Sequence, residues 1–435
     1  MPEVTADHLP DTLSAWLDYW ERLHPVGIDM GLERVRAVAE RMELVHEGGL
    51  QGAHSPPQVI TVAGTNGKGS TVALLASLAR AHGKRVGCYT SPHLVRYNER
   101  VTIDGEPASD ALLVAGFARV EKARRAAPDI SLTYFEAGTL CALWCLAQSA
   151  LDVVVLEVGL GGRLDAVNII DADVAIVTTI AQDHAGFLGN DIAQIGREKA
   201  GIFRAERPAV LGSQALPSSV AETAKAVQAP VYALDEAFSR TPAERGKWAF
   251  QCESAPALTA LPDPGLPLDN AATALQALVL AGVELKPQAV VAALEQVSLP
   301  GRMQWHGQWC LDVGHNPHAA AYVAERFKGL PEGGRRWCLL GMLDDKDAAG
   351  VIAALRPVIS DWVCVSLDGP RARCADALAQ DVVAQGGWVH HCAASPEAGA
   401  EWLGSQLNND DIVLVAGSFF TVGALLATPR FASGA

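Results

Sequence analysis

The sequence predicts an α/β protein with two domains: a larger P-loop domain with a mostly parallel sheet over residues 1–298, and a smaller Rossmann-like α/β domain over residues 299–435. In both parts, short apolar runs alternate with segments of helical spacing, which is typical of parallel sheets covered by helices. Pro300-Gly301 interrupts this alternation and marks the predicted boundary. With 435 residues, of which 49% are hydrophobic, the chain can bury two cores.

The strands predicted in the larger domain are apolar and rich in β-branched residues. They cover residues 59–63, 85–89, 152–158, 174–180 and 209–212. Helical spacing follows the first strand over residues 70–82, and two later helices are predicted from Asp269 or Asn270 to Ala281 and over 287–296. Residues 235–267 are rich in proline and polar residues, and they predict an irregular β segment.

A second alternation predicts the smaller domain. Its expected strands cover residues 309–313, 336–340, 362–366 and 412–416. Ligands bind at the carboxyl ends of strands in open α/β sheets. The loops after Val158, Ile180, Val313 and Ala416 are therefore where we expect chemistry.

Composition and charge narrow the class of protein. A formal net charge of -15 argues against a general nucleic-acid or membrane-surface role, because a polyanion would be repelled. The nine cysteines lack paired C-x-x-C spacing, and residues 1–10 do not resemble a secretory signal. The longest apolar stretch, residues 140–151, is too short to span a bilayer. We expect a cytoplasmic monomer with reduced cysteines.

A glycine-punctuated loop follows the first strand of the larger domain and leads into a helix. Gly64, Gly67 and Gly69 allow the backbone N–H groups to converge on phosphate oxygens, and Lys68 adds a positive charge. The spacing departs from G-x-x-x-x-G-K-[ST], and an ordinary strand-to-helix turn containing a lysine is the alternative. The context favours an ATP site. It is formed by Gly64, Thr65, Asn66, Gly67, Lys68, Gly69 and Ser70.

Two further loops carry polar groups that could hold a metal ion. Glu157 ends a strand that is otherwise apolar, and Asp183-His184 follows the next predicted strand. A structural carboxylate and a loop histidine are the plainer interpretations of these residues. ATP chemistry requires Mg²⁺, however, and oxygen and imidazole donors from neighbouring strands favour a metal site.

The glycines that follow Val158 suggest a dinucleotide-binding loop, but the spacing does not fit G-x-G-x-x-G. We therefore discount a Rossmann oxidoreductase.

A set of ordered motifs resembles the dihydrofolate synthase and folylpolyglutamate synthase family, within the Mur ligase superfamily. Residues 28–34 and 133–136 resemble the bacterial bifunctional branch in particular. The resemblance covers nearly the whole chain. The motifs that carry it are Ala63-Gly-Thr-Asn-Gly-Lys-Gly-Ser70, Leu156-Glu-Val-Gly-Leu-Gly-Gly-Arg-Leu-Asp165, Asp312-Val-Gly-His-Asn-Pro317 and residues 90–100, 182–184, 196–203, 300–302, 343–347 and 417–421.

This resemblance implies an ATP-dependent ligase that joins L-glutamate to the carboxylate of dihydropteroate or of tetrahydrofolates. A carboxylate is a poor acyl donor, so ATP would first convert it to an acyl phosphate, which the glutamate amine then attacks. The enzyme would act mainly by positioning and charge stabilisation, with two Mg²⁺ ions.

The resemblance also implies residue roles. Ser91, Glu157 and His184 would hold Mg²⁺, and Lys199 would be the lysine that can carry a carbamate, an anionic oxygen donor. Lys68, His184 and Lys199 would be catalytic. Without the resemblance, a solvated helix lysine is the favoured interpretation of Lys199.

For the nucleotide, the resemblance implies contacts from the smaller domain, with ATP between the domains. We assign these contacts to Asn270, Arg302, Asp312 and His315. Val313 and Gly314 replace the Gly-Ala that is usual in the family's Asp-Gly-Ala-His-Asn-Pro.

For the pterin ring, the resemblance implies a pocket in the larger domain. Phe135 offers a stacking face, with a core aromatic as the alternative, and Thr133 and Asp165 could hydrogen-bond the ring. The full predicted set is Asp29, Thr133, Phe135, Leu164, Asp165 and Ala166.

Two other functions stay open at this stage. A peptidoglycan muramyl ligase would share the phosphate-binding loop and the mechanism but use another acceptor, and the pterin-side segments argue against it. A nucleotide-binding switch protein would use the same loop without ligase turnover. Phosphate release that depends on both glutamate and a pteroate distinguishes the three functions.

Overall fold

The computed structural model describes residues 9–182, 189, 191–331 and 333–432. The chain forms two compact units. The first comprises the described residues up to Ser91, then Asn98–Gln182 and those from Gly189 to Val297. The second comprises the described residues from Ser298 onwards, together with Pro92–Tyr97.

The first unit is built on an eight-stranded sheet, in which six neighbouring strands are parallel and the last two are antiparallel. In spatial order the strands are β10 (Val231–Ala233), β9 (Ala209–Leu211), β8 (Val174–Val177), β3 (Gln58–Ala63), β7 (Val153–Glu157), β4 (Val86–Tyr89), β5 (Val101–Ile103) and β6 (Glu106–Pro107). All five strands predicted for the larger domain are present, and the mostly parallel α/β class is confirmed. The additional strands are only two or three residues long, too short to produce a periodic pattern.

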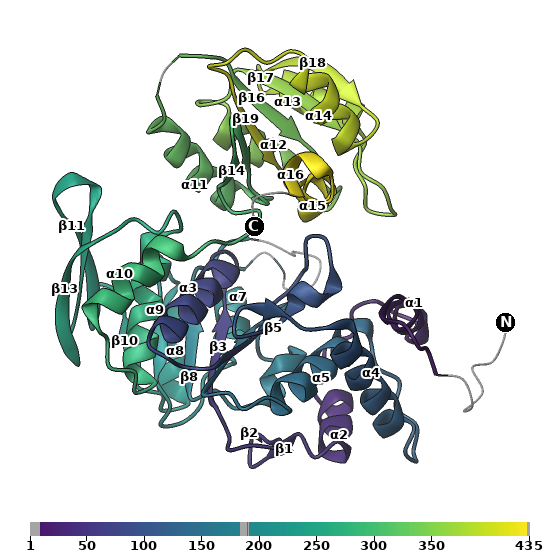
Figure 1. Ribbon diagram of the computed structural model, residues 1–435, viewed down its shortest axis with the longest axis vertical. Helices are drawn as coiled ribbons and strands as arrows, with labels where there is room; N and C mark the ends of the chain where they lie inside the picture. Colours follow the sequence, from purple (N-terminus) through teal and green to yellow (C-terminus); the bar gives the residue numbers. More distant parts are fainter. Residues whose placement is uncertain (1–8, 183–188, 190, 332, 433–435) are drawn as a thin grey trace. The chain divides into compact units, whose positions relative to one another are not determined.

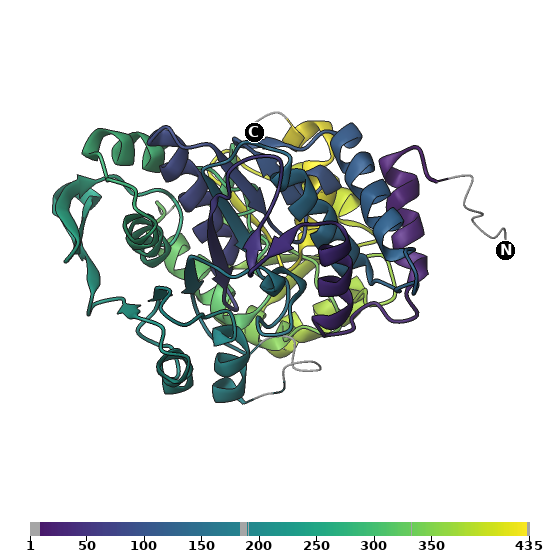
Figure 2. The same cartoon turned by 90° about the horizontal axis from the view of Figure 1, so that it is seen from below.

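Helices pack beside this sheet in groups that Figures 1 and 2 show from two directions. One group contains α3 (Lys68–Ala81), α9 (Leu268–Leu280) and α10 (Pro287–Gln296). Another contains α1 (Leu13–Leu23), α2 (Glu33–Arg41), α4 (Asp110–Arg124) and α5 (Tyr134–Ala147), and a third pairs α7 (Ile192–Ala200) with α8 (Ser218–Ala226). Helix α5 is buried almost all round, as expected for a helix without a polar face.

Smaller elements complete the first unit. Residues 235–267 form the predicted β segment as a three-stranded antiparallel sheet, in which Trp248 is buried and donates a hydrogen bond from Nε1 to the Pro262 carbonyl. Its strands are β11 (Phe238–Pro242), β12 (Trp248–Cys252) and β13 (Ala255–Leu261). The remaining elements are β1 (Val45–His46), β2 (Gly49–Leu50), η2 (Ala166–Ile169), η3 (Glu244–Gly246) and η1 (Tyr97–Arg100), of which Tyr97 belongs to the second unit.

The second unit contains a six-stranded sheet in which every neighbouring pair is parallel except the first. In spatial order the strands are β14 (Gln304–His306), β15 (Trp309–Leu311), β19 (Ile412–Ala416), β16 (Arg336–Leu340), β17 (Asp361–Val365) and β18 (Trp388–Ala393). Its helices are α11 (Pro317–Lys328), α12 (Ala348–Leu355), α13 (Ala375–Ala384), α14 (Pro396–Gly404), α15 (Phe419–Leu426) and α16 (Pro429–Ala432). The four strands predicted for the smaller domain are present, and the sequence analysis did not predict β14 and β18.

Two apolar cores cover the two faces of this second sheet. Along β16, Cys338 and Leu340 belong to the core that includes α11, α12 and α13, whereas Trp337 and Leu339 belong to the core that includes α14 and α15. Successive side chains of a strand point to opposite faces, so a strand covered on both sides reads as one continuous apolar run.

The second unit also includes a short segment from the middle of the sequence. Residues Pro92–Tyr97 belong to it, and Leu94 packs against the core that contains Val313 and Val422. The Leu94 carbonyl oxygen lies 2.3 Å from where a Cβ would stand on Gly423, so only glycine fits there. The predicted division at residue 298 did not anticipate this segment, because its apolar residues are too few to form a pattern.

Candidate active site

The glycine-punctuated loop between β3 and α3 has the backbone shape that only glycine allows. Gly64 has a φ of 153°, and a Cβ there would lie 1.9 Å from Thr178 Oγ1. Gly67 has a φ of 86° immediately before α3, and a Cβ there would lie 2.8 Å from Asn270 Nδ2. A side chain at either position would therefore push the loop away from its neighbours.

The segment after β8 holds this loop in place. Thr65 N donates to the Thr179 carbonyl oxygen over 2.7 Å, and Asn66 N donates to Thr179 Oγ1 over 3.1 Å. The hydroxyls of Thr178 and Thr179 both donate to the Asn66 carbonyl oxygen, over 2.6 and 3.0 Å. Neither threonine was predicted from the sequence to lie in the site. In the sequence they stand out only as two adjacent hydroxyl residues near the end of a predicted strand.

Lys68 and Asn270 complete the phosphate-binding loop from two helices. Lys68 Nζ donates to the carbonyl oxygens of Gly64 at 2.9 Å and Thr65 at 3.3 Å. Asn270 Nδ2 donates to Ser70 Oγ over 2.7 Å and lies 3.4 Å from the Gly67 oxygen. The assignment of Asn270 to the smaller domain is therefore wrong: Asn270 is buried in α9 of the first unit, because that helix packs on α3.

Two of the predicted metal-binding residues meet at the neighbouring strand ends. Glu157 ends β7, which pairs with β3 on one side and β4 on the other. Its side chain is buried, and Ser91, just after β4, donates its backbone N–H to Glu157 Oε2 over 3.3 Å. A carboxylate and a hydroxyl next to a phosphate-binding loop are hard oxygen donors that suit Mg²⁺.

The third predicted ligand, His184, lies outside the described residues. Among the residues that the structure describes, no three His, Cys, Asp or Glu side chains gather in a way that could hold a metal ion. The predicted site differs in kind from such a cluster, because it combines one carboxylate with a hydroxyl, an imidazole and a modified lysine.

Lys199 is buried in α7, where an ordinary solvated lysine would not lie. The loop after β7 packs tightly on this helix: a Cβ on Gly162 would lie 2.8 Å from the carbonyl oxygens of both Glu198 and Lys199. Arg163 N also donates to the Glu198 oxygen over 2.8 Å. Burial thus argues against the solvated alternative, and the carbamate stays a prediction.

Asp165 and Phe135 both approach the point where a side chain on Gly159 would begin. The closest ring atom of Phe135 lies 2.5 Å from where a Gly159 Cβ would stand, and Asp165 Oδ2 lies 3.3 Å from the same point. Asp165 is buried and accepts hydrogen bonds from the backbone N–H groups of Leu160 and Val167, over 2.8 and 3.0 Å. Burial raises the pKa of Asp165 to about 6, although these N–H donors and the Lys68 charge act in the opposite direction.

The other predicted pterin residues lie nearby in the chain, but with different surroundings. Thr133 is buried, and its hydroxyl accepts from Glu136 N over 3.2 Å while Thr133 N donates to Glu136 Oε2 over 2.8 Å, which forms the capping box of α5. Leu164 is half-buried and Ala166 is buried at the start of η2. The Thr133 hydroxyl therefore has a structural role whether or not it meets a ligand.

Asp29 joins this group through a residue that the sequence analysis missed. Arg34 in α2 forms an ion pair with Asp29 at 2.7 Å and another with Glu136 at 3.1 Å. Arg34 belongs to the quoted motif at 28–34, but nothing in the sequence pairs it with Glu136.

In the second unit, the remaining predicted nucleotide residues form a small cluster. Asp312 is buried and accepts from the backbone N–H groups of Met303 and Gly314, over 3.0 and 2.8 Å. Burial raises the pKa of Asp312, against the opposite influence of Arg302 and His315. The Arg302 guanidinium lies 5.2 Å from the centre of the Phe419 ring, and the His315 ring lies 6.1 Å from it. Phe419 was not predicted, although it lies in the quoted motif at 417–421.

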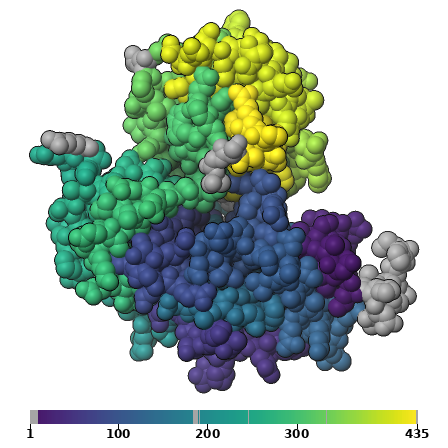
Figure 3. Space-filling model, viewed as in Figure 1, coloured from purple at the N-terminus to yellow at the C-terminus, as the bar shows by residue number. Residues whose placement is uncertain are grey.

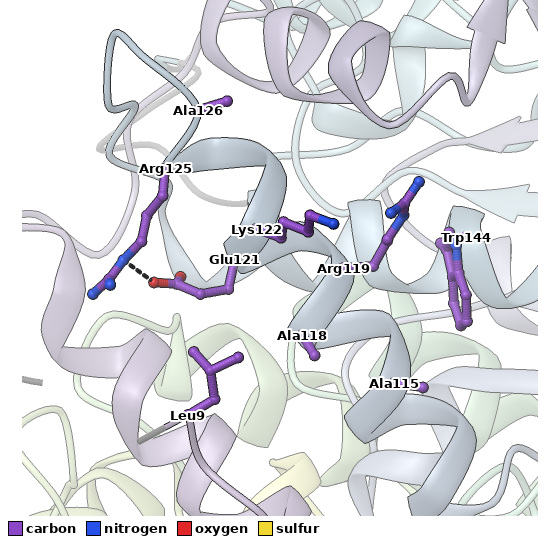
Figure 4. Close-up of a pocket in the computed structure, with 9 residues that line it drawn as sticks. All are labelled: Leu9, Ala115, Ala118, Arg119, Glu121, Lys122, Arg125, Ala126 and Trp144. Atoms are coloured by element: carbon purple, nitrogen blue, oxygen red, sulfur yellow. Dashed lines mark ion pairs between the residues drawn. The ribbon is translucent and has the colours of Figure 1, made fainter. Parts of the chain in front are cut away.

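A separate surface depression lies on α4 and has no predicted site residue in its lining (Figure 4). Its basic side chains are Arg119, Lys122 and Arg125, of which Arg125 pairs with Glu121 at 2.6 Å. The chemistry predicted from the sequence belongs to the strand ends instead.

Comparison with known proteins identifies two domains in this chain. Residues 62–231 match the Mur ligase middle domain, and residues 301–419 match the Mur ligase glutamate ligase domain. Together with the phosphate-binding loop, these matches place the chain in the Mur ligase superfamily of ATP-dependent ligases.

Individual relatives are closer still. The chain is 47% identical to the dihydrofolate synthase/folylpolyglutamate synthase of Escherichia coli K12, over 95% of this chain and 94% of that protein. It is 39% identical to the Haemophilus influenzae protein of the same name, over 95% and 97%. The solved structure of E. coli FolC in complex with DHPP and ADP superposes with a TM-score of 0.89 and 44% identity, covering 95% of this chain and 97% of that one.

A fourth comparison concerns a metal-containing structure. The Yersinia pestis enzyme complexed with AMPPNP and Mn ion has a TM-score of 0.88 and 44% identity, covering 97% of this chain and 99% of that one. The chain therefore belongs to the dihydrofolate synthase/folylpolyglutamate synthase family, and it is a ligase. The resemblance inferred from the motifs is confirmed. The comparisons do not test the predicted roles of individual residues, which stay predictions.

Proposed function

We propose that this chain adds L-glutamate to dihydropteroate, giving dihydrofolate, and to reduced folates, giving folylpolyglutamates, with ATP as the energy source. The observation that carries the proposal is that one sheet edge holds both the phosphate-binding loop after β3 and, after the adjacent strand β7, the loop with Gly159 and Asp165, against which Phe135 of α5 packs. The relatives support it, since E. coli FolC binds DHPP and ADP, and a related bifunctional synthase binds Mn, AMPPNP and L-glutamate.

The chemistry proceeds in two displacements. An oxygen of the substrate carboxylate attacks the γ-phosphorus of ATP, and the bond to the bridging oxygen breaks to release ADP. The glutamate amine then attacks the carbonyl carbon of the acyl phosphate. Phosphate leaves with the electron pair of the C–O bond, and the amine nitrogen loses a proton as the amide forms.

The chain's own residues bind and orient the reactants. The backbone N–H groups at the N-terminus of α3 attract the phosphates, and Lys68 can turn from the loop carbonyls to a phosphate oxygen. Bound Mg²⁺ would neutralise charge on the phosphate oxygens, and Ser91, Glu157 and His184, with a carbamate on Lys199, would hold it.

On the acceptor side, Phe135 presents a ring for stacking. Asp165 would accept hydrogen bonds from the exocyclic N–H groups of a pterin. Lys68 influences the ionisation of Asp165, so the pterin pocket and the phosphate-binding loop are close enough to interact electrostatically.

The test is phosphate release from ATP with dihydropteroate and then tetrahydrofolate as acceptor, each with and without L-glutamate. We expect release with both acceptors, dependent on glutamate. Turnover only with muramyl substrates would indicate the peptidoglycan ligase alternative, and acceptor-independent release would indicate a nucleotide switch.

A further inference from the structure

Residues 24–32, between α1 and α2, form no helix or strand. His24 at the beginning of this segment and Arg34 just after its end both form hydrogen bonds with residues 131–136, around the start of α5. At its beginning, His24 Nδ1 lies 2.8 Å from Ser131 Oγ. Just after its end, Arg34 donates to Glu136 Oε1 over 3.1 Å. The segment is therefore held at both ends by residues 131–136.

Asp29, in the middle of the segment, contacts both His24 and Arg34. Its Oδ2 lies 2.7 Å from Arg34 Nη1 and 3.3 Å from His24 Nε2. Arg34 Nη2 also donates to the Asp29 backbone oxygen over 2.9 Å. A single guanidinium thus fixes both the side chain and the backbone of Asp29, while it also bonds Glu136.

Arginine is suited to this role for a geometric reason. Its planar guanidinium carries five N–H donors in a fixed fork, so it can hold two carboxylates and a carbonyl oxygen at once. The Glu136 side chain is only 4% exposed, and a buried carboxylate that loses its cation is strongly destabilised. A lysine could reach one partner but could not span all three.

Glu136 links residues 24–32 to the proposed pterin pocket. That residue forms the capping box of α5 with Thr133, and between them in the chain stands Phe135, whose ring lies with Asp165 beside Gly159. Movement of Glu136 would therefore reach the stacking ring.

We propose that Arg34 is a positioning residue for the pterin-containing acceptor: by bridging Asp29 and Glu136, it orders residues 24–32 beside the ring of Phe135. This inference rests on the proposed function. Arg34 acts through Asp29 and Glu136 and takes no part in phosphoryl transfer, so its effect falls on acceptor binding.

Kinetics of Arg34→Met and Arg34→Lys test the proposal, with Arg36→Met as the matched control. Arg36 lies on the same helix and is exposed, and its side chain makes no hydrogen bond or ion pair within the described part of the chain. We expect the KM for dihydropteroate to rise roughly tenfold in Arg34→Met, and by less in Arg34→Lys, which keeps one of the bonds. The KM for ATP and kcat should stay within about twofold in both, and Arg36→Met should match the wild type.

A purely structural role for Arg34 gives a different result. If the variants lost kcat in proportion to the loss of folded protein, with an unchanged KM for dihydropteroate, the proposal would be overturned. If Arg34→Met does not fold, the kinetics of Arg34→Lys still test the proposal.

Hydrogen exchange of the substrate-free protein separates this inference from the proposed function. Backbone amides of residues 24–32 should exchange roughly tenfold faster in Arg34→Met than in the wild type or in Arg36→Met. Equal exchange in the three proteins would refute the ordering role. A wild type inactive with dihydropteroate would instead refute the proposed function, while the exchange result would stand.

Discussion

The predicted site residues of the first unit are held by contacts within that unit. Several of their ionisable side chains are buried. Lys68 bonds the carbonyl oxygens of its own loop, Glu157 is buried at a strand end, and Asp165 is buried among backbone N–H donors. Of these, Asp165 has a pKa raised by its burial, and strongly perturbed ionisable groups often mark functional sites.

Lys68→Ala should abolish phosphate release, because the loop would lose the only charge that the predicted motif supplies to the phosphates. The loss should be at least roughly 100-fold in kcat. The fold should persist, since the hydrogen bonds from Lys68 to the Gly64 and Thr65 carbonyl oxygens stay within one loop, and a single hydrogen bond typically contributes only about 1 kcal/mol to stability. Lys84→Ala, at an exposed lysine beyond the end of α3, serves as the control. Wild-type rates in Lys68→Ala would contradict the ATP site.

The pH dependence of stability should reveal the buried carboxyl of Asp165. Its pKa of about 6 in the folded chain lies above the ordinary value of 3.8, so the folded state binds its proton more tightly than the unfolded state does. Its contribution to stability is therefore complete below the ordinary value and is lost as the pH rises through 6. The free energy of unfolding of the wild type, relative to Asp165→Asn, should fall by roughly 2.5 kcal/mol between pH 4 and pH 7. Urea denaturation at several pH values measures this difference, and a constant difference would show that the carboxyl titrates normally.

At the scale of elements, the site is an arrangement of neighbouring strand ends. The β3, β7 and β4 strands bring the phosphate-binding loop, Glu157 and Ser91 to one edge, and α7 adds Lys199. This is possible because all parallel strands end at the same edge of a sheet.

Glu157→Gln should raise the Mg²⁺ concentration needed for half-maximal phosphate release, by roughly tenfold or more, because an amide is a weaker donor than a carboxylate. The measurement is a Mg²⁺ titration at saturating ATP. Glu106→Gln, at an exposed glutamate in β6, should leave the titration unchanged. An unaltered Mg²⁺ requirement in Glu157→Gln would make Glu157 a structural carboxylate.

Over the whole molecule, the two compact units are not two consecutive stretches of the sequence. Residues Pro92–Tyr97 leave the first unit after Ser91 and belong to the second, and Leu94 packs against the second unit's core. Within the described chain, no helix is both long and apolar enough to cross a membrane.

Leu94→Ala should destabilise the second unit, although the residue lies in the sequence of the first. Truncating a buried leucine costs about 2–5 kcal/mol, and the partial burial of Leu94 predicts the lower end of that range. Hydrogen exchange in α15 should become faster, whereas exchange in α5 should not change. Val95→Ala, at the exposed neighbour, is the control. Equal exchange in α15 for both variants would contradict the packing role of Leu94.

The sequence by itself determined the α/β class, the phosphate-binding loop and the family, because these depend on local patterns. Periodicity fixes the strands, glycine spacing fixes the loop, and ordered motifs identify the relatives. Glu157 was singled out as a charged residue that ends an apolar strand, whereas Asp165 was predicted only from the resemblance to the family.

Only the tertiary structure decided which distant residues meet. It placed Asn270 against the phosphate-binding loop, fastened Asn66 with Thr178 and Thr179, and joined Asp29 to Glu136 through Arg34. These contacts join residues from about 100 to about 200 positions apart in the chain, and packing of helices and strands creates them. Local spacing carries no record of which helix will lie beside which, because that choice minimises the exposed apolar surface of the whole unit.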